Sequence, residues 1–346
     1  MSIIGSVGSL AVDQAVLRLR LDNSSRQVST GQKSEVYGGL GPEARRAIDL
    51  RGEVGRRESY ANAADRALGR AAATQTVLSR LHDIAAELGA EALRARTMLG
   101  TGAEALAKAA TAALEEVAAL LNTRHGGEYL FGGSDVSSPP VPNAAAIATS
   151  PMATAIAAAV AGLDATNGAT VIADTVTAAT DPTSTPFSPF MEGDGSTEAA
   201  RAVQVADGER VTIGVFANRN QDGEVTESWG RELMRNLAVL AALTPEMAEE
   251  GGGWDGLLDS VAGSLTGAAT DLANEQAVLG AAEQRIGRNQ TWHKDTMVAL
   301  RTQLGSLEEV DLAQASAEIS QLKSRLEASY EVTGMLSRLS LSSLLR

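Results

Sequence analysis

The 346-residue sequence contains no cysteine and only three histidines. Without cysteine the chain cannot form disulfide bonds, thiol nucleophiles or cysteine-ligated zinc sites. Aromatic residues make up 3% of the chain, so the large side chains that usually dominate buried area in compact enzymes are scarce. Alanine, with 61 copies, is instead the most abundant apolar residue. This composition favours long helices that pack closely along their length.

The chain also lacks a surplus of basic residues and a long apolar run. Its 29 Lys and Arg residues face 43 Asp and Glu residues, which gives a net charge of −14 and argues against a nucleic-acid partner, because such binding needs a basic patch. The longest apolar run, Met152 to Leu163, has about 12 residues against the roughly 20 that span a bilayer. The N-terminus has no basic segment before its apolar residues, so we expect no cleaved Sec-type signal peptide and no membrane association.

The histidines and glycine clusters do not form a catalytic or metal-binding motif. We expect His82 at the surface, His125 at the end of a helix as a cap, and His293 in a packing or surface role. The acidic glycine segment 193–198 is a turn rather than a calcium loop, because it lacks the alternating Asp/Asn series and the closing Glu. We therefore predict no catalytic residue, no metal, no cofactor and no enzymatic activity.

Both ends of the chain have apolar and small residues at intervals of three and four, the spacing of a coiled-coil seam. A thin stripe of this kind cannot bury itself, and most helical stability comes from packing against a partner. The two terminal helices can cover each other if the chain doubles back, and the remaining apolar edges predict contacts with further copies of the chain. The candidate assembly interface consists of Val7, Leu10, Leu17, Leu21, Val28, Leu312, Ile319, Leu322, Leu326 and Leu336.

Helical spacing returns inside these ends. Residues 68–99 and 103–122 form two apolar stripes separated by the glycine break at 100–102, which predicts an antiparallel helical hairpin. Helices are also expected over 228–243 and 257–304, with Gly251, Gly252 and Gly253 between them.

The middle of the chain is richer in turns. Residues 128–138 predict a strand entering a turn, 152–163 a short helix and 170–177 a strand. Alternation over 203–215 around Asp207-Gly208 predicts a β-hairpin, since an Asp-Gly pair accepts the positive φ of a tight turn. We expect few contacts to cross the boundary of this insert, so that it could be removed without unfolding the helices.

The predicted fold is therefore mainly α with an inserted α+β or β-rich domain, long antiparallel helical hairpins and coiled-coil-like terminal helices. Residues 1–35 and 306–346 would form a terminal assembly domain and residues 36–135 and 225–305 a helical rod. Residues 136–224 would form an outward-projecting insert.

Several segments resemble the bacterial flagellin superfamily. The stretch LRLRLDNSSRQVSTGQKSEVYGG, with Ser29-Thr30-Gly31 and the basic Lys33, is similar to the start of flagellins and hook–filament junction proteins. Leu279-Gly280-Ala281-Ala282 resembles the family's return helix, and Glu309-Val310-Asp311-Leu312-Ala313 with the closing LSLSSLLR resembles its C-terminal signature. EYLFGGSDVSSPPV and residues 190–218 are similar to segments of the junction protein. The glycine-rich loop 35–43 departs from the acidic-proline motif of many flagellins.

This resemblance implies a structural subunit of the bacterial flagellum, a secreted motility protein that assembles with copies of itself. Its further implied partners are neighbouring axial proteins (a hook-associated protein and flagellin), a cytoplasmic export chaperone and the flagellar type III export apparatus. The implied location is extracellular, after passage through the flagellar channel. Within the family, the sequence favours the flagellin-like hook-associated protein of the hook–filament junction over filament flagellin. A stand-alone secreted helical adhesin or effector is the alternative from another class.

Overall fold

A computed structural model describes the backbone of residues 3–97 and 102–344, and side chains within 11–97 and 102–335. The chain divides into two compact units. Unit 1 comprises residues 1–59 and 293–346, and unit 2 comprises residues 60–292. Two long helices, α2 (Ala44–Ala95) and α8 (Gly252–Glu308), each continue from one unit into the other.

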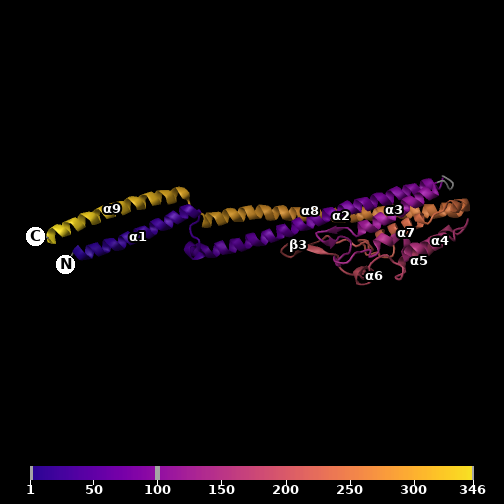
Figure 1. Cartoon of the computed structure of the whole chain (residues 1–346), viewed down its shortest axis with the longest axis horizontal. Helices are drawn as coiled ribbons and strands as arrows, with labels where there is room; N and C mark the ends of the chain where they lie inside the picture. Colours follow the sequence, from indigo (N-terminus) through magenta and orange to yellow (C-terminus); the bar gives the residue numbers. More distant parts are fainter. Residues whose placement is uncertain (1–2, 98–101, 345–346) are drawn as a thin grey trace. The chain divides into compact units, whose positions relative to one another are not determined.

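Unit 1 is built from the two ends of the chain. It contains α1 (Ile3–Thr30), the 3-10 turn η1 (Tyr37–Glu43), parts of α2 and α8, and α9 (Leu312–Leu344). The helices α1 and α9 lie side by side and run antiparallel, as the indigo and yellow helices of Figure 1 show. The predicted terminal helices are thus present and cover each other within one chain.

Unit 2 has a helical core formed by α2, α3 (Ala103–Leu121), α7 (Trp229–Ala241) and α8. The side chains of Arg80 on α2 and Glu116 on α3 form an ion pair with an Nε–Oε1 distance of 2.7 Å, which agrees with the predicted helical hairpin. The helix α7, which packs against α3, is buried over the whole range 229–240. Several of its polar side chains are paired: Arg235 binds Glu232 and Thr175, and the Asn236 amide donates to Ser264 Oγ at 2.7 Å.

The insert between α3 and α7 is more helical than the sequence predicts. After the short strands β1 (Arg124–His125) and β2 (Glu128–Tyr129) come η2 (Ala144–Thr149), α4 (Pro151–Val160) and α5 (Gly168–Thr180). Then follow α6 (Pro189–Glu192), η3 (Asp194–Ser196), β3 (Ala202–Ala206) and β4 (Glu209–Thr212). The turn η4 (Pro245–Glu250) joins α7 to α8. The predicted helix over 152–163 is confirmed by α4, whose N-terminus is capped by the Ser150 hydroxyl.

The strand predicted over 170–177 is wrong, because these residues belong to α5. Its β-branched composition favours a strand locally. However, Val171, Thr175 and Ala179 are buried at helical intervals of four, in a helix that packs against α4 and α7. Tertiary packing outweighs the local preference here.

The predicted hairpin at Asp207-Gly208 is confirmed. Strands β3 and β4 pair antiparallel with Val203 opposite Val211, and Gly208 has a φ of +74°. The strand expected from Glu128 is only two residues long, and it pairs with β1 across Gly126-Gly127 before the chain turns. The histidine of β1, His125, does not cap a helix as expected, because α3 ends at Leu121.

The insert shares one hydrophobic core with the helices. Buried apolar residues of the insert, among them Val141, Ile147, Met152, Ile156, Met191 and Val205, belong to the same cluster as residues of α3, α7 and α8. Contacts of η2 with α3 and of α4 and α5 with α7 build this continuity. The structure thus differs from the expectation that few contacts cross the boundary, although the fold class, mainly α with a small β region, is confirmed.

Candidate assembly interface

Two sequence segments that carry the family resemblance meet in unit 1. The α1 helix ends at Thr30. The next residue, Gly31, has a φ of +71° that lets the chain turn, and its N–H donates to the Gln27 carbonyl at 2.8 Å. The Val310 N–H then donates to the Gly31 carbonyl at 3.0 Å, and the Lys33 N–H donates to the Glu308 carbonyl at 2.7 Å. This short antiparallel pairing joins the end of α1 to the break between α8 and α9.

Side chains strengthen the same junction. The Asp311 carboxylate caps α9 by accepting from the N–H groups of Ala313 at 2.9 Å and Gln314 at 3.1 Å. Glu308 binds Arg51 of α2 with an Nη2–Oε2 distance of 2.7 Å, and the Lys33 ammonium donates to the Ser306 carbonyl at 2.8 Å. The end of α1 and the start of α9 are therefore fixed relative to each other by backbone and charged contacts.

Further along the pair, polar side chains connect the two helices. The Gln14 amide donates to Thr333 Oγ1 at 2.9 Å and to Ser329 Oγ at 3.1 Å. Arg18 Nε donates to the Tyr330 hydroxyl at 2.7 Å, with the guanidinium 5.4 Å from the centre of the ring. These contacts define the register of the two helices. The α1–α9 seam therefore contains polar as well as apolar side chains.

The structure places most of the described candidate interface residues in or beside this seam. Leu322 is buried, Leu312 is exposed, and the remaining described members are half-buried: Leu17, Leu21, Val28, Ile319 and Leu326. The side chains of Val7, Leu10 and Leu336 lie outside the described residues. The small residues Ser24 and Ala315 are buried and allow the helices to approach each other. The contacts that these residues make with other copies stay a prediction.

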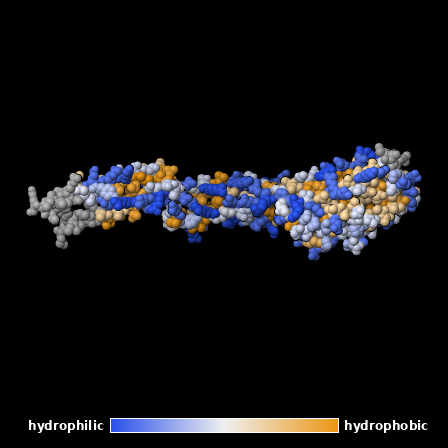
Figure 2. Space-filling view, viewed as in Figure 1, coloured by the Kyte–Doolittle hydropathy of each residue, from blue (hydrophilic) through white to orange (hydrophobic). Residues whose placement is uncertain are grey.

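A second apolar stripe on each helix was missed from the sequence. Val12, Val16 and Leu19 follow one face of α1 at i, i+4 and i+7, and their exposed fractions are 64%, 42% and 61%. Ala328, Val332 and Met335 have the same spacing on α9 and are exposed as well. The contacts of Gln14 with Ser329 and Thr333 place both stripes at the same level of the pair. Figure 2 shows hydrophobic patches between hydrophilic residues over the described part of α1 and α9.

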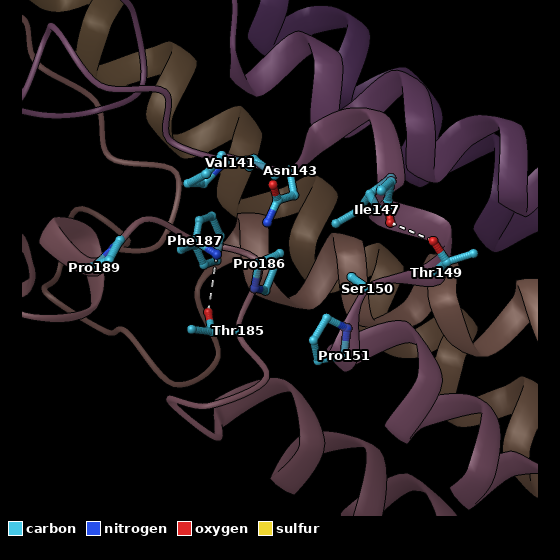
Figure 3. A pocket seen from close by; sticks show the side chains of 12 residues that line it. Val141, Asn143, Ile147, Thr149, Ser150, Pro151, Thr185, Pro186, Phe187 and Pro189 are labelled. Atoms are coloured by element: carbon cyan, nitrogen blue, oxygen red, sulfur yellow. Dashed lines mark hydrogen bonds between the residues drawn. The ribbon is translucent and has the colours of Figure 1, made fainter.

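Unit 2 has an apolar cavity of about 440 Å³ within the insert, shown in Figure 3. Phe187, Val141 and Ile147 lie around it together with four prolines, Pro142, Pro151, Pro186 and Pro189. None of its lining side chains is titratable. It therefore offers space for an apolar group but no acid, base or nucleophile. Among the described residues no group of three or more His, Asp or Glu side chains has the arrangement of a metal site.

Comparison with known families finds a match for the C-terminal part of the chain. Residues 263–345, about a quarter of the sequence, match the bacterial flagellin C-terminal helical region. The matched range begins within α8 and includes both the Glu309–Ala313 junction and α9. No curated protein matches the chain. No described helix is both long and apolar enough to cross a membrane.

The match shows that residues 263–345 are similar to the C-terminal helical region of bacterial flagellins, and this similarity supports a flagellar structural role. Flagellins are structural, non-enzymatic, extracellular components of the flagellum, and they self-assemble into its filament. The geometry of α1 and α9 agrees with such a role, because both helices present apolar surface that their own chain leaves uncovered.

Proposed function

We propose that the protein is a structural subunit at the hook–filament junction of the bacterial flagellum and assembles through the α1–α9 pair. The observation that carries the self-assembly is the second apolar stripe of each helix. Three of its residues on α1 alone, Val12, Val16 and Leu19, expose between 42% and 64% of their surface. Burial of such residues contributes roughly 25 cal/mol per Å² of apolar surface. In a homopolymer, these stripes would pack against the α1–α9 pairs of adjacent copies.

The remaining parts of the proposal rest on the family resemblance. The chain would leave the cell through the flagellar export channel with the help of an export chaperone and the type III apparatus. It would then contact a hook-associated protein on one side and flagellin on the other. We keep the three-part division as a prediction, with residues 1–35 and 306–346 in the assembly layer. Residues 136–224 would face outward, and no cofactor is required.

The junction assignment is supported by the pairing of the two segments that resemble junction proteins. Gly132 forms a β-bridge with Phe216, and the Ala217 N–H donates to the Phe131 carbonyl at 3.1 Å. Phe131 also packs edge-on against Trp229 of α7, with the ring centres 6.1 Å apart. The segments 128–138 and 190–218 are thus connected through buried residues.

Filament flagellin is the alternative, and the match of residues 263–345 to the flagellin C-terminal region favours it equally. Electron microscopy of native flagella with an antibody against residues 136–224 separates the two. Label at a single position next to the hook is expected for the junction protein. Label along the whole filament would contradict the junction assignment and support a flagellin.

Self-assembly itself is tested at the exposed stripe of α1. Leu19→Asp places a charge on the apolar face without removing a buried side chain, so we expect assembly to fail while the monomer keeps its helical content. Ser25→Asp introduces the same charge at an exposed polar position of α1 and should assemble normally. Sedimentation and electron microscopy measure the outcome. Normal polymers from Leu19→Asp would contradict assembly through this face.

A further inference from the structure

Unit 2 has a second cavity, distinct from the assembly helices, with a volume of about 420 Å³. It lies where β1–β2 and β3–β4 face α2, and its volume falls within the range of small-molecule sites. Four of its lining residues are apolar: Ala63, Ala67, Val203 and Ile213. The others are polar or small, and four of them can carry a positive charge: Arg66, Arg70, His125 and Arg201.

One carboxylate faces these cations. Glu128 uses a single oxygen, Oε2, for both of its ion pairs: Arg70 Nη1 lies 3.3 Å from it, and Arg201 Nη1 also binds it. Arg70 exposes only 7% of its side chain and also donates to the backbone carbonyls of Tyr129 and Leu130. The protein therefore holds these two guanidinium groups in fixed positions at the cavity.

The third guanidinium, that of Arg66, has no ion pair among the residues that the structure describes. Arg66 is exposed on α2 and makes no hydrogen bond or ion pair with any residue that the structure describes. The three arginines and Glu128 carry a summed charge of +2 at the cavity, in a chain whose net charge is −14. Burial and, after it, the neighbouring Arg201 lower the pKa of Arg70, while Glu128 opposes the shift.

We propose that this cavity binds a small organic dicarboxylate. Two carboxylates balance the two excess charges, and guanidinium groups pair with carboxylates through two parallel hydrogen bonds. The apolar side of the cavity, including Val203 and Ile213, suits a short carbon chain between the two ends. The binding is independent of the assembly role proposed above, because every lining residue belongs to unit 2.

The test is isothermal titration of dilute, full-length protein with glutarate at low ionic strength. We expect saturable binding that Arg66→Gln and Arg201→Gln each weaken at least tenfold. Arg45→Gln removes the same charge from an exposed position of the same helix and should leave binding unchanged. Glutaramide, which is neutral, should not bind. No saturable binding of glutarate, or an equal loss in Arg45→Gln, would overturn the proposal.

Two further measurements distinguish a free dicarboxylate from phosphate and from an acidic side chain of a second copy. Inorganic phosphate should bind more weakly than glutarate, because it cannot use the apolar side of the cavity. Phosphate binding as tight as glutarate binding would overturn the assignment to a dicarboxylate. Sedimentation of the protein should not change with glutarate. If glutarate instead dissociates oligomers and Arg66→Gln does the same, the anion is an acidic side chain of a second copy and the free-ligand assignment fails.

Discussion

Arg231 and Glu192 form a buried ion pair that links the central helix α7 to the insert. Arg231 Nη2 donates to the two carboxylate oxygens at 2.8 and 3.1 Å, and the two side chains expose only 5% and 18% of their surface. The same guanidinium donates to the Val225 carbonyl at 3.1 Å and to the buried carbonyl of Ala179. One side chain of α7 thus holds three segments of unit 2 together.

We expect Glu192→Leu to lower the free energy of unfolding by about 3–5 kcal/mol, because it leaves the Arg231 charge buried without its carboxylate. The double variant Arg231→Met/Glu192→Leu should regain part of that loss. Arg80→Met, which breaks the exposed pair with Glu116, should cost only about 0–1 kcal/mol. Urea unfolding measures all three, and equal costs for Glu192→Leu and Arg80→Met would contradict the buried role.

The insert as a whole is expected to be required for the stability of unit 2. Replacement of residues 137–222 by a short Gly-Ser linker removes Met152, Ile156 and Met191 from the shared core. Each buried residue of this size typically contributes about 2–5 kcal/mol, which is a large part of the stability of any domain. Thermal unfolding followed by circular dichroism should show a much lower transition temperature. An unchanged transition would show that the insert is independent of the helices.

Gly230 is a position in the helix α7 that has no room for a side chain. A Cβ atom there would lie 2.0 Å from the carbonyl oxygen of Ala217, which is backbone and cannot move aside. We therefore expect Gly230→Ala to destabilise the protein by about 1–3 kcal/mol. Gly263→Ala lies in α8, where an added Cβ meets no atom within 4 Å, and should stabilise by about 0.5–1 kcal/mol. Chemical unfolding compares the two, and stabilisation by both would contradict the contact.

The sequence predicts local features of this fold well. The Asp207-Gly208 hairpin and the long helices depend on residues close together in the chain, so turn chemistry and periodicity suffice to find them. The helix α5 was missed because its helical state depends on contacts with α4 and α7 rather than on its own composition.

The assembly helices and the basic cavity also differ in how far the sequence predicts them. The heptad spacing of the terminal helices correctly indicates that they pair, but the same residues cannot tell which side meets another copy. Only the paired structure shows that Val12, Val16 and Leu19 stay exposed. The basic cavity could not be found from the sequence, because Arg66, His125 and Arg201 come from distant segments that tertiary packing brings together.

The stability of unit 2 should depend on pH through Glu275. Burial raises the pKa of this carboxyl group from 4.5 to about 7, while a hydrogen bond from Gln221 Nε2 at 2.6 Å opposes the shift. Between these two values the folded state binds more protons than the unfolded state, so stability falls as the pH rises from about 4.5 to 7. Below 4.5 the penalty is absent, and above 7 it is complete.

Glu275→Gln keeps an acceptor for Gln221 but cannot ionise. We expect it to be more stable than the original protein by about 1–3 kcal/mol at pH 8, with the difference shrinking toward pH 4.5. Glu87→Gln, at an exposed position, is the control. Urea unfolding midpoints measured from pH 4.5 to 8.5 give the stability difference between each variant and the original protein. A stability gain from Glu275→Gln that is the same at every pH would exclude titration of this group as the cause.

The α1–α9 seam should open far more readily than the core of unit 2. Among the side chains that the structure describes on α1 and α9, only Ser24, Ala315 and Leu322 are buried, whereas α7 is buried over 229–240. Because local opening costs little where few apolar groups are buried, we expect amide hydrogens within 11–30 and 312–335 to exchange in dilute protein at rates orders of magnitude faster than those of α7. Assembly should slow them, since neighbouring copies would then cover the exposed stripes.

Leu322 provides the decisive variant for this seam, because it is its most buried large side chain among the described residues. Leu322→Asp places a charge in the seam and should abolish both the remaining protection of α1 and the ability to assemble. The exchange of α7 should stay unchanged, because α1 and α9 belong to unit 1 and α7 to unit 2. Ser320→Asp, at an exposed position of α9, should alter neither. Protection of α1 equal to that of α7 in the dilute original protein would mean that the pair is a stable structure on its own, and that burial against other copies is not needed to complete it.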